Sequence, residues 1–201
     1  MTPTNFKNNF MKKNVLTFLL IFSMLSLSNA QITNIGGGLA LSTGFSFHQQ
    51  TYDGNRSGVV GISFKHIHKI SVPINISGTF TIYFPHITSD QLSKQSVHAN
   101  MLDVNGHYIF NALDRFEFYG LTGLDILSAW NKYTSVGYPA TREHYFAFGL
   151  NLGGGTYMNI TKQLDIYGEL KYVVGKYHQF ILNAGVLLDI DWLKKHEDTD
   201  L

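Results

Sequence analysis

Side chains alternate between apolar and polar along much of this 201-residue chain, and the pattern is clearest between Ser71 and Phe84. Successive side chains on a β-strand point to opposite faces, so such a segment has one apolar face and one polar face. Comparable segments recur about eight times, and each has roughly ten residues or more, which is enough to cross a bilayer as a tilted strand. The chain is therefore predicted to be all-β, an eight-stranded antiparallel up-and-down transmembrane barrel.

The first thirty residues differ from the rest of the chain. Three lysines and no acidic residue precede an uncharged apolar run, Val15–Leu27, and small residues follow it before Gln31. This order predicts a signal peptide at 1–30 that is cleaved before Gln31. An uncleaved membrane anchor is the alternative, but the run is shorter than the roughly twenty residues of a spanning helix. The barrel would then cover 31–193, and 194–201 would form a charged periplasmic tail.

Composition excludes several classes of function. The formal net charge falls from +1 to −2 once the three lysines of residues 1–30 are removed, and near-neutrality disfavours nucleic acid as a partner. The chain has no cysteine, which excludes disulfides, thiolate metal sites and cysteine nucleophiles. No cofactor and no metal motif is indicated. Abundant glycine and aromatic residues fit an all-β protein.

The expected strands leave two long polar connections, Pro85–Val97 and Ser128–Glu143, on the extracellular side, and a tight turn at His66–Lys69 on the periplasmic side. An even number of strands places both termini in the periplasm, and longer loops outside are typical of these barrels. The strands are expected at about 35–47, 58–65, 70–84, 99–110, 116–127, 144–157, 164–173 and 180–192.

A soluble sandwich or lipocalin-like barrel, with the apolar face inside, is the alternative architecture. Two features disfavour it: the residues opposite the apolar face are small and polar, which suits a narrow lumen, and aromatic residues gather at both strand ends, as in interfacial girdles. The extracellular girdle would contain Tyr83, Phe84, Trp130, Tyr133 and Tyr145, and the periplasmic girdle Tyr108, Phe110, Phe116, Phe118, Tyr157 and Trp192.

Four stretches carry a resemblance to a known family: VPINISGTFTIYFP at 72–85, YGLTG at 119–123, GLNLGGGTY at 149–157 and LDIYGELKY at 164–172. On these the mature chain resembles the small outer-membrane β-barrel proteins of Bacteroidetes-type bacteria, related in architecture to OmpX and to the OmpA membrane domain. The resemblance implies location in the outer membrane and contact with its lipid, including lipopolysaccharide. It implies a barrel without implying an activity.

Ionisable residues are expected inside the barrel, because they lie opposite the apolar face. A charge in a narrow lumen must be paired or hydrated. The residues could form a network of ion pairs that closes the lumen, or line an ion path, and the small diameter of eight strands favours the network. The set is Lys65, Asp103, Asp125, Glu169 and Lys171.

Five histidines are expected at the extracellular strand ends. Convergence of these side chains could create a metal or pH-sensing site, but their spacing matches no metal motif, so polar rim residues are the simpler interpretation. They are His48, His86, His98, His144 and His178.

Some eight-stranded barrels modify lipid A, and such an enzyme requires a nucleophile, a base and an acid. Ser128, His144 and Glu143 come nearest to such a set, although no spacing marks Ser128 as activated. The leading prediction is therefore a non-enzymatic structural or accessory barrel that acts through its loops. It would be a subunit of an envelope assembly, with an envelope protein partner, in secretion, membrane-protein assembly or adhesion. A narrow channel or small-molecule carrier and a lipid A enzyme are the alternatives.

Overall fold

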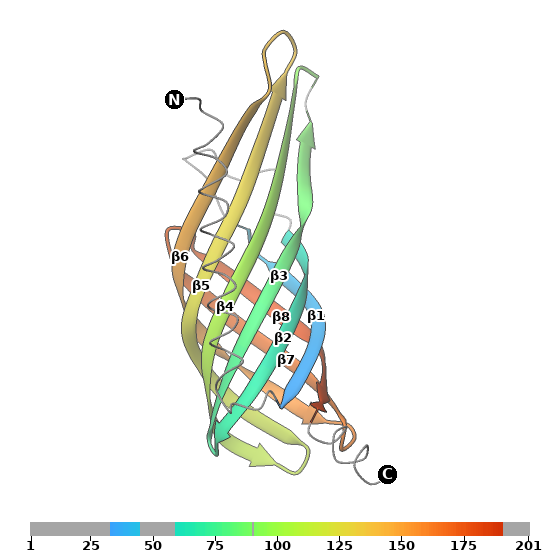
Figure 1. Cartoon of the computed structure of the whole chain (residues 1–201), viewed down its shortest axis with the longest axis vertical. Coiled ribbons are helices and arrows are strands. Elements are labelled where there is room, and N and C mark those ends of the chain that lie inside the picture. The colour runs from blue at the N-terminus through green and yellow to red at the C-terminus, as the bar shows by residue number, and fades with distance from the viewer. Residues whose placement is uncertain (1–32, 45–58, 90, 191–201) are drawn as a thin grey trace, which may run out of the picture. The chain divides into compact units, whose positions relative to one another are not determined.

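The barrel consists of eight antiparallel strands, each paired with its neighbours in the chain, and closes through pairing of the first strand with the last (Figure 1). The computed structural model describes residues 33–44, 59–89 and 91–190. In that part of the chain, no helix is both long and apolar enough to cross a membrane. The predicted fold class is confirmed. The strands are β1 (Asn34–Ser42), β2 (Val59–Ser71), β3 (Ile74–Ser89), β4 (Ser93–Leu113), β5 (Phe116–Ser135), β6 (Thr141–Asn159), β7 (Leu164–Gly175) and β8 (Gln179–Asp189).

The outer surface of the barrel is apolar. Phe64, Leu102 and Phe148 are exposed, whereas Lys65 and Asp103, which follow the first two in the chain, are buried. A soluble barrel has the opposite arrangement, and a continuous exposed band of Ile, Leu and Phe is stable only against lipid. The alternative of a soluble sandwich or lipocalin-like barrel therefore does not fit the structure.

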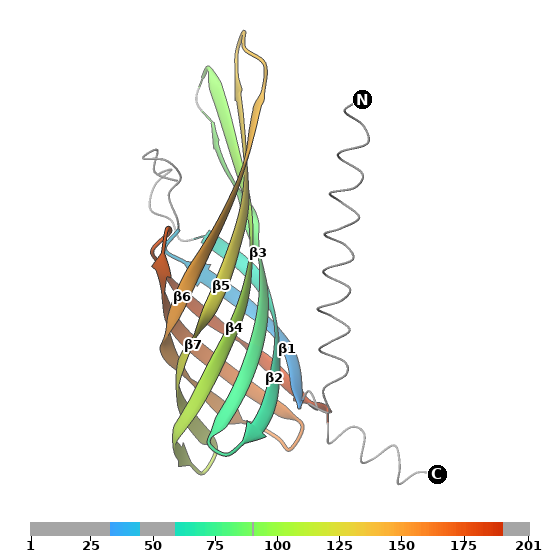
Figure 2. The same ribbon diagram turned by 60° about the vertical axis from the view of Figure 1, so that its left-hand side comes forward.

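Four strands continue beyond the closed ring at one end (Figures 1 and 2). β3 loses its β2 partner after Tyr83, and β6 loses its β7 partner before Gly149, yet β3, β4, β5 and β6 remain paired with one another. We call the unclosed part, residues 84–89, 93–98, 130–135 and 141–148, the extension. It lies at the end opposite Asn34 and Asp189, which pair with each other. The termini of an even-stranded barrel are expected in the periplasm, so we assign the extension to the extracellular side.

The extension replaces the two long loops expected from the sequence, so those two predictions are wrong. Only residues 90–92 and 136–140 separate the paired strands there. The predicted turn at His66–Lys69 is also wrong, because β2 runs to Ser71. The physical reason is the same for the two loops. Apolar and polar residues alternate along a strand only where one of its faces is in contact with lipid. Above the membrane both faces are hydrated, and a polar strand then looks like a loop.

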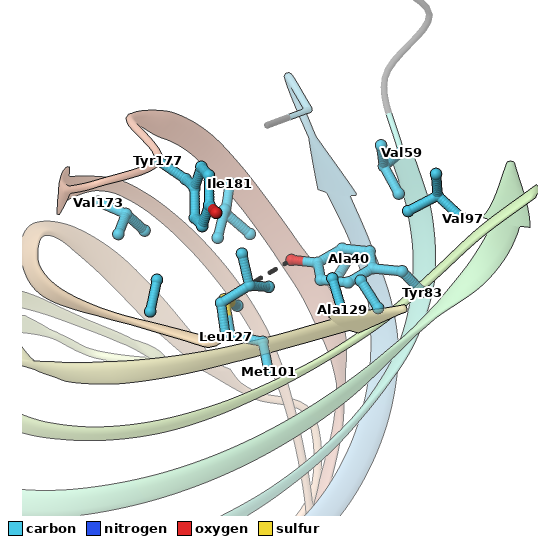
Figure 3. Close-up of a cluster of buried hydrophobic side chains, with 12 residues drawn as sticks. Ala40, Val59, Tyr83, Val97, Met101, Leu127, Ala129, Val173, Tyr177 and Ile181 are labelled. Carbon is cyan, nitrogen blue, oxygen red and sulfur yellow. Dashed lines mark hydrogen bonds between the residues drawn. The ribbon is translucent and has the colours of Figure 1, made fainter. Parts of the chain in front are cut away.

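The interior holds two clusters of apolar side chains. The extracellular cluster includes Tyr83, Met101 and Tyr177, and Tyr83 Oη donates a hydrogen bond to Met101 Sδ at 3.9 Å (Figure 3). The periplasmic cluster contains six buried residues from other strands: Ile67, Tyr119, Leu121, Tyr157, Tyr167 and Leu187. The expectation of a small and polar interior is therefore wrong at these residues, because a narrow barrel is filled by its own side chains.

The girdle prediction is wrong at four positions. Tyr83 and Tyr157 are 2% and 4% exposed and point into the barrel, because they share the inward register of their strands. Tyr145 packs against the extracellular cluster, and Tyr133 lies on the same inner side of β5 and β6, so neither faces lipid. Trp192, the predicted signal peptide at 1–30 and the predicted tail at 194–201 lie outside the described residues.

Candidate functional site

A buried ion pair joins β2 to β7 across the interior. Lys65 and Glu169 have side chains 1% and 0% exposed, with Nζ and Oε2 2.5 Å apart. Tyr119 on β5 donates to the same carboxylate oxygen at 3.0 Å. The ammonium group and the phenol both donate to this carboxylate, and these bonds offset the hydration that it loses on burial. A buried carboxylate without such partners would be strongly destabilising.

A second ion pair lies between β4 and β7. Lys171 Nζ is 2.7 Å from Asp103 Oδ2, and Asn151 donates to Asp103 Oδ1 at 2.9 Å and to Asn105 Oδ1 at 2.8 Å. Asp125 faces Asp103 directly in the β4–β5 register and is also buried. The structure thus brings all five predicted interior residues into the barrel, as two lysines against three carboxylates.

A buried histidine, which is not among the residues predicted for the lumen network, links this network to the periplasmic cluster. His107 accepts or donates a hydrogen bond with Ser77 Oγ at 2.9 Å and with Tyr157 Oη at 2.6 Å. Its ring stacks on Tyr119 with centroids 4.4 Å apart. The alternation along β4 could have shown this, because His107 is two residues from Asn105 and four from Asp103, and every second residue of a strand faces the same side.

The interior arrangement favours a structural role over an ion path. Each lysine contacts a carboxylate, and apolar clusters occupy the lumen on both sides of the network. A conducting pore instead needs a continuous hydrated passage.

The extension presents two different faces to water. The outer face continues the lipid-facing side of the barrel. On this face the strand register forms two neighbouring rows across β4, β5 and β6. The first row is His98, Trp130 and His144, and the second is Ser96, Lys132 and Arg142. On the opposite face, Gln95 donates to Asn131 at 3.1 Å, and the hydroxyl of Tyr145 donates to Glu143. That bond raises the pKa of Tyr145 to about 12, because it stabilises the protonated phenol.

Three of the predicted histidines can be placed by their side chains. His98 and His144 flank Trp130, and the rings of His144 and Trp130 stack at 5.0 Å. His178 lies apart, stacked on Tyr172 near the turn between β7 and β8. His86 is placed by its backbone pairing with Val97, while His48 lies outside the described residues. Across the part of the chain that the structure describes, no three His, Asp or Glu residues form a metal-binding group.

The structure joins two of the three candidate catalytic residues. Ser128 Oγ lies 2.9 Å from His144 Nε2 on the outer face. Glu143 faces the other way, where it accepts the bond from Tyr145, because neighbouring residues of a strand point to opposite faces. A serine–histidine pair without an acid to orient the imidazole is an incomplete catalytic triad.

Solved structures share this architecture. Ail, the attachment invasion locus protein of Yersinia pestis, aligns at a TM-score of 0.51 and 19% identity, over 78% of this chain and 99% of that protein. The same protein bound to the heparin analogue sucrose octasulfate aligns at 0.53 and 18%, over 77% and 97%. A major outer membrane protein from Thermus thermophilus aligns at 0.53 and 10%, over 77% and 98%. The chain has the fold of outer-membrane β-barrels. No protein-family model and no curated protein matches the sequence.

This fold and the apolar outer band together place the chain in the bacterial outer membrane. The resemblance seen in the sequence is confirmed at the level of a small outer-membrane barrel.

Proposed function

We propose that this barrel is a non-enzymatic structural or accessory subunit of an envelope assembly, in secretion, membrane-protein assembly or adhesion, and that it contacts its partner through the extension. The observation that carries the proposal is the extension itself. Four strands project beyond the barrel although the ring beneath them is already closed, and such a projection adds nothing to closure (Figure 2).

The outer edge of β6 provides the means of contact. Among the described residues, no strand pairs with this edge between Thr141 and Phe148, since pairing with β7 begins at Gly149. An unpaired edge exposes backbone donors and acceptors, to which an extended segment of another protein can add as a further strand. The segment 141–148 contains no proline, which would block such pairing; Arg142 and Glu143 are its only Lys, Arg, Asp or Glu residues, so an added strand with complementary charges opposite them would pair best.

The alternatives have weaker support. The apolar clusters and paired lysines fill the interior, which argues against a channel or carrier. The serine–histidine contact supports an enzyme only in part, because it lacks the acid. Ail is named for attachment and invasion, so a barrel of this fold can serve at a cell surface. We further propose membership of the OmpX-like barrels of Bacteroidetes-type bacteria, on the sequence resemblance.

The test is a pull-down of the tagged protein from native outer membranes in mild detergent, with co-purifying proteins identified by mass spectrometry. One variant lacks residues 87–96 and 132–142. Ile87 pairs with Ser96, and Lys132 pairs with Arg142, so each deletion shortens a hairpin without changing the strand register below it. A control variant replaces the periplasmic turn 160–163 with glycine and serine. We expect a stoichiometric envelope protein with the wild type and the control, and its loss from the shortened variant. A barrel that purifies alone, or a partner retained by the shortened variant, would contradict the proposal.

A further inference from the structure

The extension has two open edges, and only one of them suits a further strand. On β3, the edge beyond Tyr83 contains Pro85, which has no N–H to donate, and the register with β4 shifts between Tyr83 and His86. Prolines and bulges protect natural sheet edges from further pairing. On β6, the segment from Thr141 to Phe148 has no proline, and its register with β5 is continuous (Figure 1). The β6 edge is therefore the one that can receive a strand.

Every second residue of β6 directs its backbone groups towards this open edge. The carbonyl oxygen of Phe148 identifies the set, since a Cβ added at Gly175 of β7 would lie 2.7 Å from it. Backbone groups of alternate residues point to the same side of a strand, so those of Phe146, His144 and Arg142 point to the open edge as well. Within the described part of the chain, no backbone hydrogen bond joins these three residues to another strand on that side. An added strand would pair with them above the end of β7.

The end of this edge nearer the barrel lies beside lipid. Phe146 and Phe148 are exposed on the outer face and continue its apolar band, and the stacked pair of Trp130 and His144 above them has the position of a membrane interface. In hydrocarbon an unpaired backbone group has no water to bond, so lipid beside Phe146 favours an added strand. Side chains of that strand next to Phe146 and Phe148 would also meet lipid, and must be apolar.

The other end of the edge carries two charges that point to opposite faces. Arg142 is exposed on the outer face, directly opposite Lys132 of β5. Glu143 is exposed on the inner face, where the described residues of the extension include no lysine or arginine. Opposite charges on neighbouring strands stabilise a sheet and like charges destabilise it. Arg142 therefore favours an acidic residue on its open side, and Glu143 favours a basic one.

We infer that the β6 edge receives one amphipathic strand from another protein of the same outer membrane. The strand runs antiparallel to β6, as neighbouring strands do throughout the barrel, and thus from the membrane outward. It carries apolar side chains beside Phe148 and Phe146, a basic residue beside Glu143 and, next in its sequence, an acidic residue beside Arg142. This assignment rests on the proposed function and narrows its partner to a membrane protein, because a strand of a soluble protein has no need of the two apolar positions.

The experiment measures binding of fluorescent eight-residue peptides to the folded full-length protein in phosphatidylcholine nanodiscs, with empty nanodiscs as the background. The reference peptide has valine beside Phe148 and Phe146, lysine beside Glu143, glutamate beside Arg142 and small polar residues elsewhere. A second peptide exchanges the lysine and the glutamate, and a third replaces both valines with serine. We expect each to bind about tenfold more weakly than the reference, because two cross-strand contacts are lost or reversed. The variant Arg142→Glu/Glu143→Arg should prefer the second peptide to the reference.

Two variants of one residue test whether the peptide binds at the edge. His144→Pro removes an N–H from the open edge, whereas His144→Ala removes the same side chain and keeps the N–H. The proline variant should bind the reference peptide about tenfold more weakly than the alanine variant, and the heat-induced gel mobility shift reports whether each is folded.

Equal binding of the reference and charge-exchanged peptides, or equal binding by the two His144 variants, would overturn the inference. Undiminished binding of the serine peptide would overturn it too, and would make a strand of a soluble protein the occupant. These measurements use no native partner. The pull-down can therefore succeed while the peptides fail, which would place the partner elsewhere on the extension, and it can fail while the edge binds peptides as expected.

Discussion

Removing one partner of the buried Lys65–Glu169 pair should destabilise the barrel far more than removing an exposed lysine. Both side chains are almost fully buried and the charged atoms are 2.5 Å apart. In Lys65→Met, Glu169 keeps only the hydrogen bond from Tyr119, and the interior then holds one lysine against three carboxylates. Breaking a buried pair by removing one partner typically costs about 3–5 kcal/mol, because the other charge is left uncompensated. We expect a loss in this range.

The double variant Lys65→Met/Glu169→Gln tests whether the charge itself is the cause. It restores the wild-type balance of charge, and glutamine can still accept the bond from Tyr119, so the unfolding free energy should return to within about 2 kcal/mol of wild type. The assay is reversible urea unfolding in lipid vesicles, followed by tryptophan fluorescence, with exposed Lys162→Met as a control expected to change by less than about 0.5 kcal/mol. A loss below about 1 kcal/mol in Lys65→Met, or a double variant no more stable than the single, would refute the reasoning.

Three further predictions concern the barrel wall, the lumen and the serine–histidine contact. Gly36→Ala should cost about 1–3 kcal/mol in the same unfolding assay, since its Cβ would meet the backbone oxygen of Val186 at 1.8 Å, whereas Gly120→Ala, with open space around the added methyl, should change little. The purified barrel should show no conductance steps in a planar bilayer, because side chains fill its interior; regular steps would favour the channel. Ser128→Ala should leave the mass profile of lipid A identical to that of cells with the wild-type protein; a changed profile would make the Ser128–His144 pair catalytic.

The membrane-embedded part of the fold could be predicted because lipid imposes a strict alternation on it. Leu102, Asp103 and Val104 illustrate this rule: the charged residue between two apolar ones must face inward, and it does. The same rule gave the number of strands and the closed topology.

The part of the extension beyond Phe146 could not be predicted by that rule, because both of its faces are in contact with water. Lys132, Tyr133 and Thr134 carry no alternation in polarity, and the segment therefore resembled a loop although it is part of β5. The partners inside the barrel were also beyond the sequence. Parity shows that Lys65 and Glu169 point inward, but only the order and stagger of β2 and β7 around the ring bring them together.

The account depends most on the extension lying outside the cell. The chain has no cysteine, so a single introduced thiol can be labelled without background. Thr134→Cys on the exposed end of β5 and Lys162→Cys on the opposite end of the barrel are treated, in intact cells, with a membrane-impermeant maleimide. The account predicts labelling of Thr134→Cys in intact cells, and of Lys162→Cys only after the outer membrane is permeabilised. The reverse pattern would contradict it.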